Sequence, residues 1–374
     1  MKVKNCPSVD RSDKVWNRNS RLGSSVRNFL KRLAVARPTG QVLRWVNKDL
    51  ITVLCYHGLT SDLSSQGLRN YDGKHISVDM FERQMRYISQ NSTVYPLEKI
   101  SECLNQGTPC GPHGVVITFD DGYKSNYELA FPILKHYGLT ATFFVTTGFI
   151  GSDHLLWVDQ LEIAFEQTRL QNIAIESNSV LPLTIVSDCL VALKQAKDYL
   201  KNMRDNKKRR MIKEMLKRLG FKRLSVHDSH YDYQPMSWEN ISEMSSSGMS
   251  IGSHSVTHAI LSRCNEVELN DEITRSKNMI QDRIQRECTL FCYPNGQKGD
   301  FDNCTLEKLR QTEYKCAVLL FGGYNTIETD PFQLRRFAVG AGNTLQDFKY
   351  LLTGCQGRIL CGREARYRKS PFSR

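Results

Sequence analysis

The sequence predicts an α/β protein in which helices cover both faces of a parallel sheet. Two observations lead to this fold class. Short apolar runs alternate along the chain with longer amphipathic segments, and the short runs are apolar throughout rather than at every second residue. Strands that are buried on both faces have this composition, and parallel strands need helical crossovers between them. A closed barrel and a doubly wound open sheet both satisfy the pattern.

The individual elements follow from hydrophobic periodicity. Residues 79–90 form an amphipathic helix with Met80, Phe81, Met85 and Ile88 on one face. Further helices are expected at 126–138, 265–285 and 304–314. The predicted buried strands occupy residues 50–58, 115–122, 140–151, 249–255, 289–296 and 316–323. In parallel α/β folds, chemistry gathers at the C-terminal ends of such strands.

The net charge of +12 comes mainly from the two ends of the chain. Twelve Lys and Arg residues precede residue 51 against three acids, and six follow residue 350 against one acid. We therefore expect a basic N-terminal segment (1–48), a folded domain (49–346) and a basic C-terminal tail (347–374). A strongly basic stretch of helical pattern, about 160–235, interrupts the alternation and is interpreted as a helical insertion. Its charges are expected to form a solvated face, and gripping an anionic substrate is the alternative.

The start of the chain lacks the apolar core of a secretory signal. The sequence also has no run of 18 apolar residues, which is about the length that a membrane-spanning helix requires. The irregularly spaced cysteines are then expected to stay reduced. These features indicate a cytoplasmic protein. The basic amphipathic stretch 26–38 and the basic ends suit peripheral contact with an anionic membrane, at its inner face, or they are simply solvated. Net charge alone also admits nucleic acid, but no such partner is expected.

The apolar run "VVITFDDGYKSN" ends on two adjacent carboxylates, Asp120 and Asp121. An Asp–Gly pair is common turn chemistry, so a turn is the simplest interpretation. Polar residues and glycines also end the other predicted strands, however, including His57, His254 and Asn295. At a shared rim, two carboxylates can divide their roles: one binds a cation and the other stays free as a base.

A second motif, "GSHSVTH", places His254 and His258 four residues apart. On a helical turn both imidazoles can reach one ion, although core histidines account for many such pairs. Asp121 would add an oxygen ligand. Three protein ligands with an open position are typical of a catalytic metal site. Zn²⁺ is the default ion, and Co²⁺, Ni²⁺, Mn²⁺ or Fe²⁺ also tolerate this ligand set.

Together, "TFDDGY" and "HSVTH" resemble the first two motifs of the polysaccharide deacetylase family, also called the NodB homology or carbohydrate esterase family 4 domain. The resemblance extends over roughly residues 50–345 and includes "VLCYHGL", "LLWVDQLE", "FCYPNG" and "DPFQLRRFAV". It implies a distorted (β/α) barrel of about seven strands, which would here carry the basic helical insertion. It also implies a hydrolase that removes acetyl groups from carbohydrate.

The resemblance assigns roles to the residues that match the motifs. Asp121, His254 and His258 would hold one divalent metal ion, and Asp120 would act as general base toward the attacking water. The backbone N–H of Asn295 in "YPNG" would help to stabilise the developing oxyanion. The products would be acetate and a free amine, if the substrate is an N-acetylated sugar; O-acetyl groups are the other possibility.

Two departures from the family pattern affect this assignment. The usual third motif begins with an arginine that orients the base, whereas this chain has Cys292 at that place. Arg335 or Arg336 of "QLRRFAV" could reach in from a neighbouring strand end, and Arg335 is preferred. The family's general-acid histidine is also missing, because none of the nine histidines follows His258. Either His57 supplies the proton, or Asp120 serves as both base and acid; a buried structural His57 is equally compatible with its local sequence.

Four further residues in the matching motifs are expected to line the substrate site. They are Tyr123, Trp157, Asp159 and Tyr293, with Asn295 beside them. Trp157 could stack on a sugar ring, and it could equally be a core residue. Asp159 could instead be a carboxylate that stabilises a helix start.

Two functions remain after these steps. The favoured one is a metal-dependent deacetylase that acts on an N-acetylated amino-sugar glycan or glycan precursor. The alternative is a carbohydrate-binding or membrane-docked module of the same fold with weakened catalysis, which the missing arginine and histidine suggest.

Overall fold

Parallel strands form the centre of the protein, whose computed structural model describes residues 24–62, 67–176 and 179–356. The main sheet has eight strands, seven of them in the order β11–β10–β9–β6–β5–β1–β12, while β4 pairs with β5. All their pairings are parallel, as predicted. The strands are β1 (Thr52–Tyr56), β4 (Thr93–Val94), β5 (Gly114–Phe119), β6 (Thr142–Val145), β9 (Ser250–Ser253), β10 (Leu290–Cys292), β11 (Cys316–Val318) and β12 (Phe337–Ala338).

Residues 331–338 connect the two edges of this sheet. The N–H of Leu319 donates to the Leu334 carbonyl (2.7 Å), and the Leu334 N–H donates to the Ala317 carbonyl (3.1 Å), so this segment first pairs with β11. A few residues later the same segment forms β12, which pairs with β1. The sheet is thereby curled into a distorted barrel whose interior receives side chains from this connecting segment.

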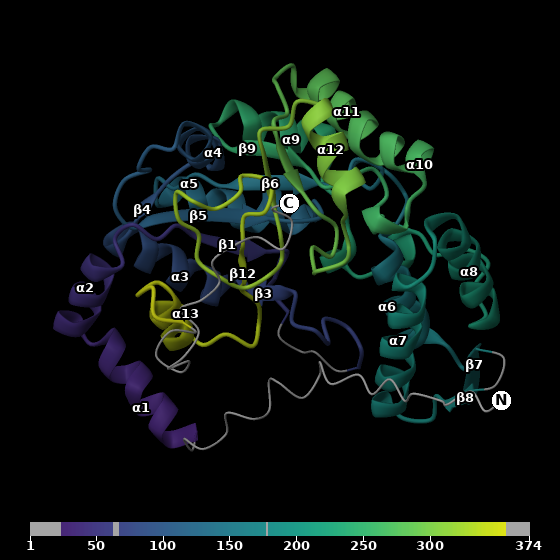
Figure 1. Cartoon of the computed structure of the whole chain (residues 1–374). Helices are drawn as coiled ribbons and strands as arrows, with labels where there is room; N and C mark the ends of the chain where they lie inside the picture. Colours follow the sequence, from purple (N-terminus) through teal and green to yellow (C-terminus); the bar gives the residue numbers. More distant parts are fainter. Residues whose placement is uncertain (1–23, 63–66, 177–178, 357–374) are drawn as a thin grey trace, which may run out of the picture.

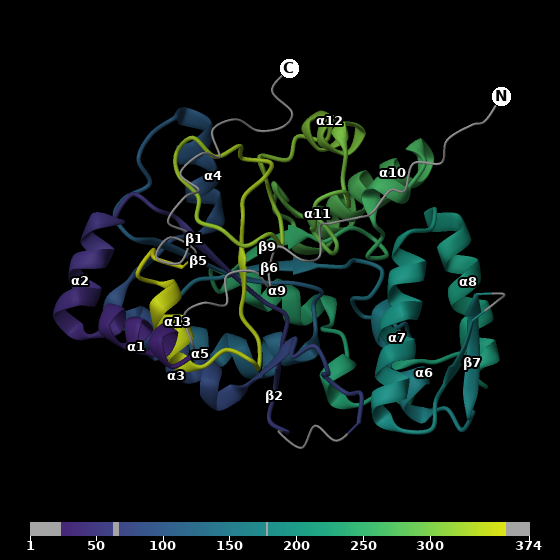
Figure 2. The ribbon, with the colours of Figure 1, turned by 60° about the horizontal axis from the view of Figure 1, so that its bottom comes forward.

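Helices cover the outside of the sheet (Figures 1 and 2). The helix predicted at 79–90 is α3 (Val78–Asn91), which begins where the Ser77 hydroxyl accepts a hydrogen bond from the Met80 N–H and which buries Phe81, Met85 and Ile88. The other covering segments are α4 (Leu97–Gln106), η1 (Asn126–Ala130), α5 (Phe131–His136), α9 (Trp238–Ser246), η4 (Leu261–Arg263), α10 (Glu266–Asn270), η5 (Asp271–Arg275), α11 (Ser276–Ile284) and α12 (Asn303–Gln311). A small parallel pair, β2 (Gly58–Thr60) and β3 (His75–Ser77), lies beside the sheet.

The segment predicted as a helical insertion forms a separate layer at one side of the molecule (Figure 1). It has its own cluster of buried apolar side chains, drawn mostly from residues 155–233. The expectation of a purely helical segment was incomplete, because β7 and β8 pair as an antiparallel hairpin. Its elements are α6 (Trp157–Gln167), β7 (Asn172–Glu176), β8 (Ser179–Pro182), α7 (Val186–Lys201), α8 (Asp205–Arg218), η2 (Val226–Asp228) and η3 (Tyr231–Tyr233).

Two helices, α1 (Ser24–Val35) and α2 (Arg37–Val46), belong to the predicted N-terminal segment, and α13 (Leu345–Leu351) lies next to them. The predicted boundary at 346/347 falls inside α13, and this placement is wrong because Phe348, Leu351 and Leu352 pack into the main core. The rest of both basic ends, residues 1–23 and 357–374, lies outside the described residues. Within the described ranges, no helix combines the length and apolarity that a membrane crossing requires.

Candidate active site

Two buried carboxylates follow the last residue of β5. Asp120 and Asp121 are 2% and 3% exposed, and the Asp120 N–H donates to the Tyr56 carbonyl (3.0 Å), which ties the strand end to β1. Asp121 has a φ of 75°, a left-handed conformation that Asp tolerates better than most residues. Ser255, His258 and Asn295 also have positive φ values. Strained backbone of this kind gathers at functional sites, where surrounding contacts hold it in place.

Asp121, His254 and His258 converge on one point. The Asp121 Oδ1 atom lies 3.5 Å from His254 Nε2 and 3.4 Å from His258 Nε2. One ligand atom of each residue lies within 4.8 Å of the others. Asp121 Oδ1 is buried and has no hydrogen-bond partner among the described residues. A buried carboxylate oxygen without a donor, facing two imidazole nitrogens, fits a divalent cation.

The second nitrogen of His254 is held by the neighbouring strand. His254 Nδ1 lies 2.9 Å from the Cys292 carbonyl oxygen at the end of β10, and this contact fits an N–H donor at Nδ1. Nε2 is then the nitrogen with a free lone pair, directed at Asp121. Metal-binding histidines are commonly oriented in this way by an acceptor at their other nitrogen.

Charge in the site favours a cation. Burial alone raises the pKa of Asp121, but the neighbouring imidazoles of His254 and His258 hold that pKa well below its usual range. Burial lowers the pKa of His258 to about 3, against the attraction of Asp121, so its imidazole is neutral and can act as a ligand near neutral pH. Two ionised carboxylates therefore lie side by side in a buried setting.

The loop that carries both histidines is fastened by Glu272 of η5. Its Oε2 atom accepts from the N–H groups of Val256 and Thr257, both at 2.9 Å, and its Oε1 atom accepts from the Thr257 hydroxyl (2.6 Å). Arg209 of α8, in the insertion, donates to Glu272 Oε1 (2.9 Å). The insertion thus supports the histidine loop from outside, through Glu272, which the sequence analysis did not identify.

Arg336 pairs with Asp120 through both of its terminal nitrogens. The Nη1–Oδ1 and Nη2–Oδ2 distances are both 2.7 Å, and both side chains are buried. Arg336 Nη2 also lies 3.1 Å from the Cys292 sulfur, and its Nε donates to the Leu319 carbonyl (2.9 Å). Burial raises the pKa of Asp120, but Arg336 outweighs this and holds that pKa well below its usual range. Asp120 is therefore ionised and fixed in orientation.

The preference for Arg335 as the partner of Asp120 is wrong. Neighbouring side chains on an extended segment point to opposite sides, so only one of the two arginines can enter the barrel. Arg336 does so, between the pairing with β11 and the pairing with β1. Arg335 lies outside beside Gly323, and its backbone exchanges hydrogen bonds with the Asn325 side chain. The sequence motif could not distinguish them because it does not reveal register.

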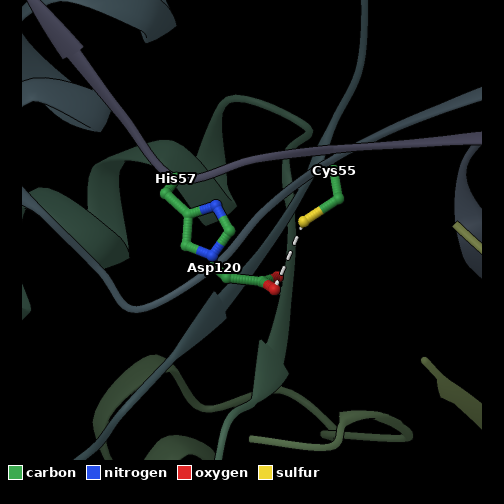
Figure 3. Close-up of side chains that lie close together, drawn as sticks. All are labelled: Cys55, His57 and Asp120. Atoms are coloured by element: carbon green, nitrogen blue, oxygen red, sulfur yellow. Dashed lines mark hydrogen bonds between the residues drawn. The ribbon is translucent and has the colours of Figure 1, made fainter. Parts of the chain in front are cut away.

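Two thiols and His57 complete the surroundings of Asp120, and Figure 3 shows one of the thiols, Cys55, together with His57. The Cys55 and Cys292 sulfurs lie 3.4 and 3.5 Å from Asp120 Oδ2. Burial raises the pKa of both thiols well above the ordinary value, so they remain protonated and donate. His57 is only partly buried and points toward Asp120, with its ring nitrogen, the Cys55 sulfur and a carboxylate oxygen within 4.8 Å of one another.

Tyr123 and Asp159 do not face a substrate in this structure. Both are fully buried, and the Tyr123 hydroxyl donates to Asp159 Oδ2 (2.9 Å). Lys74 forms an ion pair with Asp159 and lies 3.9 Å from Glu162. The expected substrate contacts of Tyr123 and Asp159 are therefore not seen in the structure. Instead, these residues form a buried polar contact between the segment after β5 and α6. Lys74 was not predicted, since an isolated lysine in a loop carries no sequence signal.

The other expected substrate residues are divided between the core and the surface. Tyr293 is buried, with its hydroxyl bonded to the Phe332 carbonyl (2.9 Å), so the expected substrate contact is not available to it. Trp157 is 7% exposed and donates from its indole nitrogen to the His258 carbonyl (3.2 Å), which supports the core alternative. Asn295 is partly exposed. No described residue accepts a hydrogen bond from its backbone N–H.

The sequence matches a family model described as polysaccharide deacetylase over residues 108–317. It is 30% identical over 155 residues, 40% of this chain, to a putative polysaccharide deacetylase, YxkH, of Bacillus subtilis. It is also 30% identical over 98 residues, 26% of this chain, to a poly-beta-1,6-N-acetyl-D-glucosamine N-deacetylase of Staphylococcus aureus. The chain spans half the length of the first of these relatives and a third of the second.

Solved structures resemble the fold over most of its length. The deacetylase PplD of Streptococcus pyogenes, solved with acetate, has a TM-score of 0.54 at 16% identity and covers 82% of this chain and 99% of its own. IcaB from Ammonifex degensii has a TM-score of 0.52 at 18% identity and covers 82% and 97%. At these identities the likeness concerns the fold alone. The distorted barrel expected from the motifs is thereby confirmed.

Proposed function

The chain belongs to the polysaccharide deacetylase family, and we propose that it is a metal-dependent hydrolase that removes acetyl groups from carbohydrate. Its substrate would be an N-acetylated amino-sugar glycan or glycan precursor. The S. aureus relative, named for deacetylation of an N-acetylglucosamine polymer, supports this substrate class. The observation that carries the proposal is the convergence of Asp121, His254 and His258 beside the Asp120–Arg336 pair.

Asp121, His254 and His258 would hold the cation, with Zn²⁺ the first candidate for two nitrogen ligands and one oxygen. When bound, such an ion would supply Lewis acidity, which polarises a carbonyl group and makes water easier to deprotonate. The residues around this position then have distinct tasks in binding the acetyl group and in moving protons.

Asp120 would accept the proton of the attacking water. Arg336 keeps its carboxylate ionised, so the base is ready at neutral pH, and the two-pronged pair fixes its direction. Among the described residues, Oδ2 is contacted by Arg336, Cys55 and Cys292, while Oδ1 is hydrogen-bonded by Arg336 alone. We assign Oδ1 as the proton acceptor because its lone pairs are less occupied.

His57 would donate the proton that the leaving amine needs. It comes from the segment between β1 and β2, is partly exposed and points toward Asp120 (Figure 3). The free N–H of Asn295 would donate to the oxyanion that forms when water adds to the acetyl carbonyl. Asp120 itself, after accepting a proton, is the other candidate for the donor.

The alternative of a binding module with weakened catalysis rested on the missing arginine and histidine. Arg336 supplies a guanidinium to Asp120 from another segment, which supports the enzyme over the module. The missing histidine keeps the alternative open to test.

Acetate release from N-acetylglucosamine oligomers tests this proposal. We expect activity that chelator removes and divalent metal restores, and that Asp120→Asn and His254→Ala each abolish. Asp153→Asn and His227→Ala serve as matched controls, because these two side chains are 67% and 80% exposed and lie next to one another at the surface. Full activity in Asp120→Asn or His254→Ala would refute the assignment. Bound metal without turnover on a panel of free, polymeric and lipid-linked acetyl sugars would favour the binding module.

A further inference from the structure

Five large apolar side chains are exposed on the two N-terminal helices. On α1, Phe29 and Leu33 lie four residues apart, and on α2, Val42, Trp45 and Val46 have a helical spacing, so each set shares one face. Trp45 is 69% exposed and Phe29 is 60% exposed. We call these five residues the N-terminal apolar face. Soluble proteins seldom leave so many large apolar side chains together in water without a partner.

The opposite side of the two helices is anchored to the domain. Ala34, Val35 and Leu43 pack with Tyr350 and Cys355 near α13. Lys31 pairs with Asp347, and Arg44 donates to the Tyr87 hydroxyl (3.1 Å). The domain therefore fixes which side of α1 and α2 faces outward, and this side is the N-terminal apolar face. Helices α1 and α2 lie across the molecule from the insertion (Figures 1 and 2).

Basic residues accompany the apolar face. Between residues 24 and 48 the sequence has six Lys and Arg and no Asp or Glu. Arg32 and Lys48 are exposed. A groove of about 410 Å³ beside α1 is lined by Arg32, Val35, Ala36, Leu345, Gln346 and Lys349, so two cationic side chains face it. Apolar and aromatic side chains flanked by cations are suited to the head-group region of an anionic bilayer.

We propose that the N-terminal apolar face docks the protein on an anionic lipid bilayer. Phe29, Leu33, Val42, Trp45 and Val46 enter the boundary between head groups and acyl chains, and Arg32 and Lys48 bind lipid phosphates. A second copy of the chain fits this face poorly, since two surfaces with the same positive charge repel. The ends of the chain beyond the described residues are also basic, so they do not complement it either.

Sedimentation with lipid vesicles tests the docking surface directly. The chain is mixed with vesicles of phosphatidylcholine alone or with 30% phosphatidylglycerol at about 0.1 M salt, where electrostatic attraction is still felt. We expect binding to the anionic vesicles only, weakening as salt rises. The measurement needs no acetate release, so its failure would leave the deacetylase proposal untouched.

Variants separate this surface from the rest of the chain. Phe29→Ser and Trp45→Ser should each weaken vesicle binding roughly tenfold, as expected for an apolar side chain removed from the bilayer. Arg32→Gln and Lys48→Gln should each weaken it about fivefold. Ile185→Ser and Val186→Ser are matched controls, since these apolar residues are equally exposed on the insertion, and they should bind like wild type.

Three results would overturn the proposal. One is absence of binding to anionic vesicles. The second is unchanged binding by the doubly substituted Phe29→Ser, Trp45→Ser protein when its melting temperature matches wild type. The third is a dimer, detected by light scattering without lipid, that the same double substitution abolishes, because the face would then be occupied by a second copy.

Discussion

Asp120 and Asp121 are neighbours with opposite surroundings, and this difference defines the site at the scale of single residues. Arg336 neutralises Asp120 completely within the protein. Asp121 faces two imidazoles and keeps a buried oxygen without a donor among the described residues. A buried anion that protein groups do not satisfy is costly unless it is paired. This difference supports the proposal that a cation binds at Asp121 and that Asp120 is left for proton transfer.

The Asp120–Arg336 pair gives the first prediction. Arg336→Lys keeps the charge but loses the two-pronged geometry, so it should lower kcat for acetate release by about 10²-fold, within the range of a misplaced general base. Arg336→Gln leaves Asp120 buried without a counter-charge and should also lower the free energy of unfolding by about 3–5 kcal/mol. Steady-state kinetics and thermal melts measure both effects.

Arg335→Lys and Arg335→Gln are the matched controls for these variants. Arg335 lies outside the barrel beside Gly323, so both substitutions should leave kcat near the wild-type value. The assigned pairing would be contradicted if the Arg335 variants lost activity while the Arg336 variants kept the wild-type kcat.

The role of His57 gives the second prediction. If His57 protonates the leaving amine, His57→Gln should lower kcat on N-acetyl substrates by about 10²–10⁴-fold. The same variant should hydrolyse an aryl acetate almost as well as wild type, because a phenolate leaves without a proton. Asp120→Asn should lose both activities. Equal loss of both activities in His57→Gln would assign His57 to another task and favour Asp120 as base and acid.

At the scale of elements, hydrogen bonds connect the insertion to the loop that carries His254 and His258. Glu272 of η5 holds the loop through two backbone N–H groups and a hydroxyl, and Arg209 of α8 holds Glu272. The Trp157 indole at the start of α6 binds the His258 carbonyl from the same side. The inserted layer therefore supports the loop that carries His254 and His258, and it is not only an addition at the surface.

This support gives the third prediction, in which metal affinity is the readout. Glu272→Gln and Arg209→Gln should weaken Zn²⁺ binding by about 10–100-fold, the usual effect of disturbing groups that orient ligands. Arg210→Gln, at the neighbouring exposed position of α8, is the control and should bind like wild type. Competition with a chromophoric chelator measures affinity without any turnover. Unchanged affinity in Glu272→Gln, in a protein that melts like wild type, would show that the loop holds itself.

At the scale of the whole molecule, the parallel sheet could be read from the sequence because buried strands are apolar throughout. The strands around Cys55, Phe119 and Phe291 were recognised for this reason. The two-residue strand β12 was expected only as a strand end at "QLRRFAV", without its bounds or its partner, since its pairing is set by how the sheet curls rather than by local pattern. The β7–β8 hairpin was hidden for a similar reason, within a strongly basic stretch whose helices dominate its periodicity.

The residues of the candidate site also fall into two groups, those that local sequence reveals and those that it does not. Asp120, Asp121, His254 and His258 stand in motifs, and the structure brings them together. Arg336, Glu272 and Lys74 reach the site from distant segments, and nothing in their local sequence marks them. Register decided between Arg335 and Arg336, and burial removed Tyr123, Asp159 and Tyr293 from the expected substrate surface. Tertiary geometry supplies both kinds of information, and a single sequence does not.

The central claim is that one cation at Asp121, His254 and His258 works with Asp120 in hydrolysis, and a metal titration tests it most directly. Protein made metal-free with a chelator is titrated with Zn²⁺, while bound metal and acetate release from N-acetylglucosamine oligomers are measured together. We predict that wild type gains activity in proportion to bound metal up to one ion per chain. Asp120→Asn should bind the same ion without releasing acetate, and Asp121→Asn should do neither. Acetate release by metal-free protein, or by Asp120→Asn at the wild-type rate, would contradict the account.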